Sequence, residues 1–231
     1  MAPDGPSDRA PSATRVTKVN ERVLATDGRV IGSRASQTRK RLLDATAKLL
    51  AEQGVLELKV VDITREVRTS PATFYQYFGD VNDAILALAD DAAEEMAPVI
   101  ALLAEPWTDG DAFEQARTFT RAFIEYWLTH QAVLRTRNLQ AEEGDPRFRE
   151  SRVRAHKGLM NPLLAKVEEG QAEGRLSVNL NPYATAAAMV AVLERLVAFL
   201  PEFGRRGVSR TAMVDTIAAI LVQQLTGHAA V

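Results

Sequence analysis

An apolar stripe with the period of an α-helix begins near residue 36. Its members share one face of a 3.6-residue repeat: Leu42, Leu43, Thr46, Leu49 and Leu50. Ser36 is a suitable N-cap because its hydroxyl can accept a bond from a free amide of the first turn, and Gly54 is a suitable stop. The pattern therefore predicts a first helix over residues 36–54.

Helical patterning continues through the rest of the chain. It predicts helices over residues 61–67, 71–77, 80–104, 109–129, 132–142, 145–174, 181–200 and 209–227. Asp145-Pro146 and Asn181-Pro182 each place a capping side chain before a proline that suits the first helical position. No stretch alternates apolar and polar residues with period two. The sequence therefore predicts an all-α fold of about nine helices.

Two prolines fall inside predicted helices, Pro98 and Pro162. Proline removes a helical hydrogen bond and its ring clashes with the preceding turn, so both are expected to interrupt their helices. Each interruption is either part of a hinge or a local kink without a switching role.

Charge is divided unevenly along the chain. Residues 1–35 carry six basic and four acidic side chains, residues 36–79 carry seven and five, and residues 80–231 carry fifteen and twenty-one. The first two segments are therefore each +2 and the last is −6, within a net charge of −2. Such a split suits a chain whose first part faces an anion, although it is too modest to identify DNA binding alone.

Residue types argue against most enzyme classes. The chain has no cysteine, which excludes disulfides and thiolate metal sites and suits a reducing cytoplasm. The three histidines are not paired at helical spacing, and no phosphate-binding loop or nucleophile elbow is present. We therefore expect no catalytic residue, no metal site and no cofactor. No secretory or membrane-spanning segment is expected either. A helical enzyme or adaptor is the alternative function.

Residues 1–35 are rich in helix-breaking proline and glycine and poor in large apolar side chains. They are interpreted as a flexible, mildly basic arm. Two roles stay open, a disordered tail of no consequence and an arm that lies along phosphates through its basic side chains: Arg9, Arg15, Lys18, Arg22, Arg29 and Arg34.

The segment 61–78 predicts a helix-turn-helix. Phe74 and Phe78 are four residues apart and point to the core with Ile63 and Val67, while Ser70 can cap the second helix. Glutamine can pair with adenine, threonine and alanine can contact a thymine methyl, and hydroxyls and amides can hold phosphates. The outer side presents such groups: Thr69, Ser70, Ala72, Thr73, Tyr75, Gln76 and Tyr77. The alternative is a helical hairpin packed only for stability, but two outward tyrosines then need another explanation.

The string Ser-Pro-Ala-Thr-Phe-Tyr-Gln-Tyr-Phe at residues 70–78, after Ile-Thr-Arg-Glu-Val and a leucine-rich first helix, resembles the tetracycline repressor (TetR) family. The resemblance is strong over residues 38–88 and continues as a shared helix count over 109–226. It implies three DNA-binding helices, and a fourth helix that links them to a six-helix ligand and dimer domain.

This resemblance divides the chain into an arm (1–35), a DNA-binding domain (36–82) and an effector and dimer domain (83–231). Double-stranded operator DNA is the implied partner. The predicted DNA-binding residues are Thr38, Arg39, Arg68, Thr69, Ser70, Pro71, Ala72, Thr73, Tyr75, Gln76 and Tyr77.

Three positions depart from the family pattern. Arg68 stands in the turn where the family usually has glycine or asparagine, and a positive φ would be costly there, so a different type of turn is expected. Val81 stands where a phosphate-contacting lysine is common, and Thr64 stands where alanine is usual. These departures affect the detailed DNA contacts more than DNA binding itself.

Aromatic residues gather on one predicted helix, with Phe119, Phe123 and Trp127 spaced four residues apart. Such a stripe is either plain core or the wall of a ligand pocket. The resemblance favours the pocket, which adaptable methionine and aromatic side chains suit. The predicted effector-binding residues are Phe119, Phe123, Tyr126, Trp127, His130, Met160, Leu163, Met189 and Leu193. The implied effector is a small apolar molecule in a large apolar pocket.

The last two long predicted helices are rich in alanine, which allows helices to approach closely. The resemblance implies a four-helix interface between two copies of the chain, whereas the core of a monomer is the alternative. A homodimer is favoured because a single helix-turn-helix reads too few bases. The sequence is thus interpreted as a cytoplasmic transcriptional regulator, a repressor that an apolar effector releases from its operator, with no membrane partner.

Overall fold

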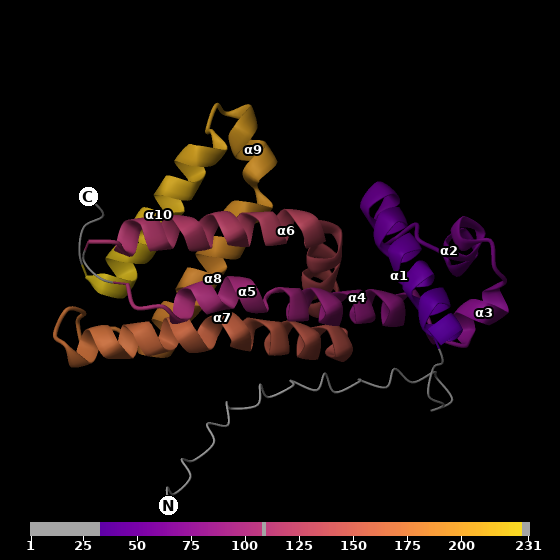
Figure 1. Ribbon diagram of the computed structural model, residues 1–231, viewed down its shortest axis with the longest axis horizontal. Helices are drawn as coiled ribbons and strands as arrows, with labels where there is room; N and C mark the ends of the chain where they lie inside the picture. Colours follow the sequence, from indigo (N-terminus) through magenta and orange to yellow (C-terminus); the bar gives the residue numbers. More distant parts are fainter. Residues whose placement is uncertain (1–32, 108–109, 228–231) are drawn as a thin grey trace, which may run out of the picture.

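The computed structural model describes residues 33–107 and 110–227, and all regular structure in these two ranges is α-helical (Figure 1). This confirms the predicted all-α class. The helices are α1 (Ser33–Gln53), α2 (Val60–Val67), α3 (Pro71–Tyr75), α4 (Val81–Glu95), α5 (Ala97–Ala104), α6 (Ala112–Glu142), α7 (Pro146–Ala172), α8 (Pro182–Ala198), α9 (Leu200–Arg205) and α10 (Arg210–Thr226). The arm predicted over residues 1–35 lies almost entirely outside the described residues.

Capping side chains begin several helices where the sequence places them, but the prediction of Ser36 as a cap is wrong, because Ser36 lies inside α1. Ser70 accepts a hydrogen bond from the Thr73 amide at 3.2 Å, and Asn181 and Ser209 accept equivalent bonds at the starts of α8 and α10. Asp145 accepts from the amide of Arg147 at 2.9 Å. Since a capped amide no longer needs a partner in the preceding turn, each bond fixes the residue at which its helix begins.

The two internal prolines act differently. The helix predicted over residues 80–104 is divided at Met96 into α4 and α5, because Pro98 has no amide hydrogen and its ring crowds the preceding turn. Pro162 does not interrupt its helix, contrary to the prediction, and α7 continues through it to Ala172. Packing of α7 against α6 and α8 along its length holds this proline in the helix.

Two other boundaries differ from the prediction. The helices expected over residues 109–129 and 132–142 form one helix, α6, since neither glycine nor proline occurs between Ala112 and Glu142. The short helix α9 was not predicted; it follows Phe199 and carries a proline in its first turn. The total in the described ranges is therefore ten helices instead of about nine.

Helices α1 to α3, here called the head, lie at one end of the molecule, and α4 leads from them to the helices α5 to α10, here called the body (Figure 1). An apolar core fills the head, and Ile63, Phe74 and Phe78 are buried in it as predicted. Val133 and Phe148, from α6 and α7, belong to the same core. The head therefore packs against the body through shared apolar contacts. The division of the chain at residue 83 stays a prediction.

The body is built around α6, which packs against α5, α7, α8 and α10. Its predicted aromatic stripe is buried there, with ring centroids 6.1 Å apart between Phe119 and Phe123 and 6.4 Å between Phe123 and Trp127. In the ranges 33–107 and 110–227, no helix combines the length and the apolar character that a membrane crossing requires.

Candidate DNA-binding and effector sites

Helix α3 is held in the head by its inward side. Phe74 and Phe78 are buried, and their ring centroids lie 5.3 Å apart. The Ser70 hydroxyl caps the helix and also lies 3.1 Å from the Thr73 hydroxyl. Helix α3 is shorter than predicted, since it ends at Tyr75 instead of Tyr77.

The outer side of α3 carries most of the predicted DNA-binding residues. Exposed members of the set are Ser70, Pro71, Ala72, Tyr75 and Gln76, and Thr69 and Thr73 are half-buried. Tyr77 differs from its neighbours, because it is half-buried and packs against the head core. The outward face of α3 is therefore centred on Tyr75 and Gln76.

The turn between α2 and α3 is left-handed at Arg68, where φ is 57° and ψ is 52°. Its amide donates to the Arg65 carbonyl, and the Thr69 amide donates to the Thr64 carbonyl, a pair of bonds typical of a helix that ends in a left-handed residue. A different type of turn was expected at this arginine, and that expectation is wrong. Arg68 is the one non-glycine residue with positive φ among the described residues.

Replacing Arg68 with glycine is expected to raise the free energy of unfolding by about 1 kcal/mol, because a left-handed backbone is costly for a residue with a Cβ. Chemical denaturation checks this. Arg68→Ala is the matched control, since it removes the same side chain but keeps the Cβ, and it should leave stability almost unchanged. Equal stabilities of the two variants would contradict the strain at this position.

Two predicted DNA-binding residues come from α1. The Thr38 hydroxyl donates to the Arg34 carbonyl at 3.1 Å, and the guanidinium carbon of Arg39 lies 5.4 Å from the Phe78 ring centroid. This cation–π contact places Arg39 beside the end of α3. Val81, the position without the common lysine, is half-buried at the start of α4.

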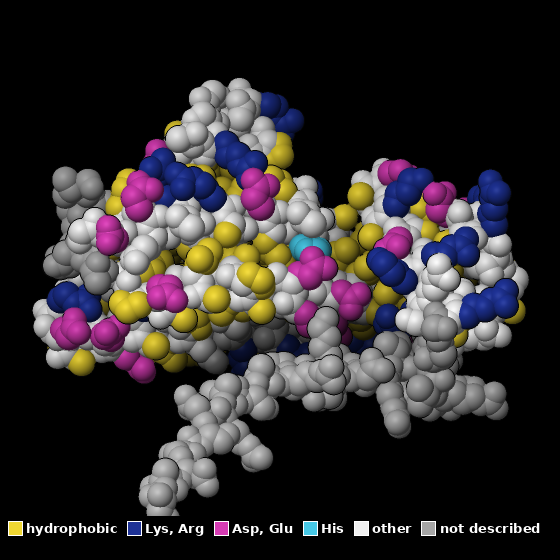
Figure 2. All heavy atoms as spheres, in the orientation of Figure 1, with side chains coloured by type: hydrophobic (Ala, Val, Ile, Leu, Met, Phe, Trp, Pro, Cys, Tyr) yellow, Lys and Arg dark blue, Asp and Glu magenta, His cyan; other side chains and the backbone are white. Residues whose placement is uncertain are grey.

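Basic side chains are spread over the head, with acidic ones among them (Figure 2). Several are already paired: Lys48 lies 2.6 Å from Glu66, Lys40 lies 3.2 Å from Asp44, and Arg41 donates to the Val67 carbonyl. Arg68 forms no ion pair or side-chain hydrogen bond within the described residues, and it is exposed beside α3. Its charge is therefore available to a phosphate.

An ion-pair cluster joins the end of the head to the body. Arg147, in the first turn of α7, lies 2.7 Å from Asp83 and 2.9 Å from Asp145, and Asp80 is 3.6 Å away. Asp80 caps α4 directly after α3. The three carboxylates raise the pKa of Arg147 above its ordinary value, chiefly through the hydrogen bond that its guanidinium donates to Asp145. Arg147 thus connects the start of α4 with the start of α7.

The predicted effector residues lie together in the body, with one exception. All except His130 belong to its apolar core: Phe119, Phe123, Tyr126, Trp127, Met160, Leu163, Met189 and Leu193. His130 lies instead at the side of α6 that faces α4, where its Nε2 is 3.1 Å from Glu95 Oε2. Its ring also lies 5.0 Å from that of Tyr126.

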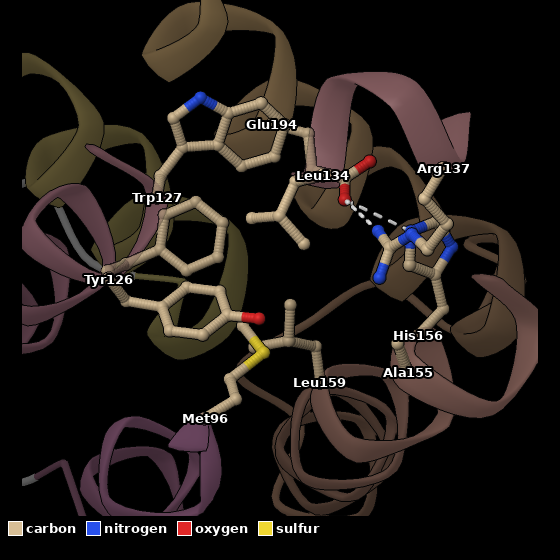
Figure 3. Close-up of a pocket in the computed structure, with 10 residues that line it drawn as sticks. Met96, Tyr126, Trp127, Leu134, Arg137, Ala155, His156, Leu159 and Glu194 are labelled. Carbon is tan, nitrogen blue, oxygen red and sulfur yellow. Dashed lines mark hydrogen bonds and ion pairs between the residues drawn. The ribbon is translucent and has the colours of Figure 1, made fainter. Parts of the chain in front are cut away.

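A small cavity opens beside the aromatic stripe (Figure 3). Only about 10 Å³ of it is open to the centre of a water-sized sphere, so it is a nearly closed space and not the large pocket that the sequence predicts. A ligand larger than a water has to displace side chains of its lining. Its lining contains three of the predicted residues and seven others: Met96, Phe123, Tyr126, Trp127, Leu134, Arg137, Ala155, His156, Leu159 and Glu194. Most of this lining is apolar, as in the ligand sites of other proteins.

The sequence reasoning missed a polar group at one end of this cavity. Glu194 Oε1 lies 3.1 Å from His156 Nε2 and 3.8 Å from Arg137 Nη2 (Figure 3). Arg137 is only 2% exposed, and burial lowers the pKa of its guanidinium. The sequence did contain one indication of this polar group, because Arg137 lies in the apolar stripe of α6, three residues after Leu134.

The alanine-rich faces of α8 and α10 are only partly covered. Ala186 and Ala218 are buried within the chain, whereas Ala184, Ala188 and Ala191 on α8 are exposed. On α10, Ala212 is exposed and Ile220 is half-buried. Part of the predicted dimer surface is thus intramolecular core, and part is an uncovered strip of small residues.

Comparisons with known proteins agree with this architecture. A family model described as the C-terminal domain of tetracyclin repressor-like proteins matches residues 101–231, and one described as bacterial regulatory proteins of the tetR family matches residues 42–83. Among curated proteins, the regulator HbdR of Aromatoleum sp. (strain CIB) is 35% identical over 60 residues, which cover 26% of this chain and 24% of HbdR.

The regulator EthR of Mycobacterium tuberculosis (strain CDC 1551 / Oshkosh) is 29% identical over 109 residues, which cover 47% of this chain and 50% of EthR. The alignments thus span half or less of these curated relatives. Salmonella enterica GusR has a similar structure, with a TM-score of 0.62 and 19% identity over 82% of this chain and 95% of that one.

Bacillus subtilis FadR, solved in complex with stearoyl-CoA, has a TM-score of 0.61 and 16% identity over 82% of this chain and 98% of that one. At such identities these structures show the fold alone. The two family models, however, together cover most of the chain, and one of them covers more than half. The chain belongs to the tetracycline repressor family of bacterial regulatory proteins.

Proposed function

We propose that the protein is a dimeric DNA-binding regulator of transcription, a repressor that a small apolar effector releases from its operator. The observation that supports DNA binding is the way in which the side chains of α3 are arranged. Ser70 caps it, Phe74 and Phe78 fix its inner side, and Tyr75 and Gln76 stand on its outer side. An α-helix presented in this way fits the major groove of B-DNA.

The chemistry of the side chains on this surface indicates which of them contact bases and which contact phosphates. Gln76 can form two hydrogen bonds with an adenine edge, and the Ala72 methyl can contact a thymine methyl. Arg68, exposed and without a partner in the described residues, suits a phosphate.

Two copies related by a two-fold axis through the uncovered strip on α8 and α10 double this surface. Their half-sites then lie about 34–36 Å apart, one turn of the double helix.

Effector release requires a connection between the cavity and the head. Met96 lines the cavity and is also the residue at which α4 and α5 divide. The other end of α4 follows α3 and is paired with Arg147 of α7. A molecule that displaces Met96 therefore moves α4, and with it the orientation of the head. Such an effector must bind the form that cannot hold DNA more tightly than the form that can.

The test is a gel retardation assay on the DNA upstream of the protein's own gene. Tyr75→Ala and Gln76→Ala are each expected to weaken specific binding by about 1–3 kcal/mol, roughly 5- to 150-fold, which is typical of a lost base contact. Neither change should alter the free energy of unfolding by more than about 0.5 kcal/mol, because both side chains are exposed.

Gln53→Ala is the matched control, since Gln53 is an exposed glutamine at the far end of α1. It should bind DNA like the wild type. If Tyr75→Ala and Gln76→Ala also retard the fragment like the wild type, α3 is not the recognition helix.

A further inference from the structure

The polar end of the cavity holds one positive and one negative side chain. Arg137 from α6 is 2% exposed, and Glu194 from α8 lies beside it with a 19% exposed side chain. His156 from α7 shares the same carboxylate oxygen. The Arg137 Nε and Nη2 atoms also donate to the Asn138 side-chain oxygen Oδ1, at 3.1 and 3.0 Å. The charges of Arg137 and Glu194 are opposite, so the pair has no net charge.

The balance of charge between Arg137 and Glu194 determines which ligands the cavity can bind. A carboxylate that enters meets a guanidinium whose charge is already offset by Glu194, and it adds a second negative charge to a poorly solvated site. Burying an uncompensated ion costs far more than burying a neutral hydrogen-bonded group. The cavity therefore disfavours an anion but not a neutral polar atom.

Two donors of the lining side chains, Trp127 Nε1 and the Tyr126 hydroxyl, have no partner among the described residues. The Tyr126 side chain is 8% exposed, and its hydroxyl points into the cavity between Met96, Leu134 and Leu159 (Figure 3). It forms no hydrogen bond with any other described residue. Burial raises the pKa of this phenol to about 12, so it keeps its proton at neutral pH. A hydroxyl that has no protein acceptor is free to donate to a ligand oxygen that enters the cavity.

We propose that the effector is a small, uncharged, apolar molecule with one acceptor oxygen, such as the carbonyl oxygen of an ester, amide or ketone. Tyr126 donates a hydrogen bond to this oxygen. The Arg137–Glu194 pair excludes the corresponding free carboxylic acid. The proposal rests on the proposed function, because it assigns the ligand class of the same cavity. Met96, Phe123, Trp127 and Leu159 supply the apolar wall for the rest of the molecule.

The chain offers an internal reporter for binding. It contains two tryptophans, so Trp107→Phe leaves Trp127, which lines the cavity, as the single fluorophore. The probes are 3-phenylpropanoate, its methyl ester, its amide and propylbenzene, titrated at pH 8, where 3-phenylpropanoate is ionised. The ester and the amide should bind at least about tenfold more tightly than the carboxylate, since the anion is desolvated without a free counter-charge.

Glu194→Gln should reverse this order. Removing the negative charge leaves Arg137 uncompensated, so the carboxylate should become the tighter ligand by about tenfold or more. Glu95→Gln is the matched control, because Glu95 forms a pair with His130 at the same 3.1 Å but does not line the cavity. It should leave the order of the four probes unchanged.

Tyr126→Phe gives an independent test that removes one oxygen atom and keeps the ring. It should lower the affinity for the ester to about that of propylbenzene, because the hydrogen bond is lost, and it should not favour the carboxylate. If Glu194→Gln does not fold, the affinities of Tyr126→Phe for the ester and for propylbenzene test the proposal instead.

The proposal is overturned if the wild-type cavity binds carboxylate and ester equally, if Glu194→Gln keeps the order of the wild type, or if no probe changes Trp127 fluorescence. Failure of the proposed function is a separate result. If the ester binds as expected but leaves the protein on its DNA in the retardation assay, release by this cavity is wrong and the ligand class stands.

Discussion

Replacing Phe74 with alanine is expected to lower the free energy of unfolding by about 3–5 kcal/mol, as is usual when a buried aromatic ring is removed and its cavity stays partly open. Phe74 has no exposed surface, and it packs against Phe78 at 5.3 Å and edge-on against Tyr75 at 5.8 Å. Because α3 has only five residues, it cannot persist without this anchor. Urea denaturation followed by circular dichroism measures the loss, and specific DNA binding should disappear with it.

The neighbouring Tyr75→Ala variant separates folding from recognition. Its ring is 52% exposed, so its removal should change stability little while DNA binding weakens. Phe74→Leu should restore much of the stability that Phe74→Ala loses, because it refills most of the volume. A Phe74→Ala protein with the wild-type denaturation midpoint would show that this ring does not anchor the head.

The head was largely predictable because local chemistry determines it. Ser70 and Pro71 set where α3 begins, and the four-residue spacing of Phe74 and Phe78 sets its inner side. The half-buried position of Tyr77 was harder to predict, because it depends on packing against the other head helices and not on the spacing of residues along the segment that contains Tyr77. The turn at Arg68 shows a similar limit, because the hydrogen bonds that close the end of α2 hold a backbone that arginine alone disfavours.

The cavity was predictable only in part. Phe123, Tyr126 and Trp127 lie on one helix, so their period identifies a shared face. Arg137, His156 and Glu194 lie on three helices and meet only through tertiary packing. His130 follows Trp127 by three residues, at the edge of that face, and reaches Glu95 of α4 instead of the cavity. Periodicity thus predicts which residues are buried together, but not which polar side chains meet between helices.

Replacing Arg137 with methionine is expected to lower the free energy of unfolding by about 3 kcal/mol, the lower end of the range for breaking a buried ion pair, since Glu194 keeps some solvent contact. The methionine fills most of the arginine stem's volume, so the loss comes from the Glu194 carboxylate, which keeps its contact with His156 but loses the charge of Arg137. The variant Arg137→Met/Glu194→Met should therefore be more stable than Arg137→Met alone, although it carries one more substitution.

A double-mutant cycle measured by urea denaturation gives the coupling between the two side chains. The exposed pair Lys40 and Asp44, 3.2 Å apart on α1, provides the comparison, and its coupling should be only about 0.3–0.5 kcal/mol. If the double variant at residues 137 and 194 is less stable than Arg137→Met, the two charges do not compensate each other. The charge balance proposed for the cavity would then fall, because a carboxylate ligand would meet a guanidinium that Glu194 does not offset.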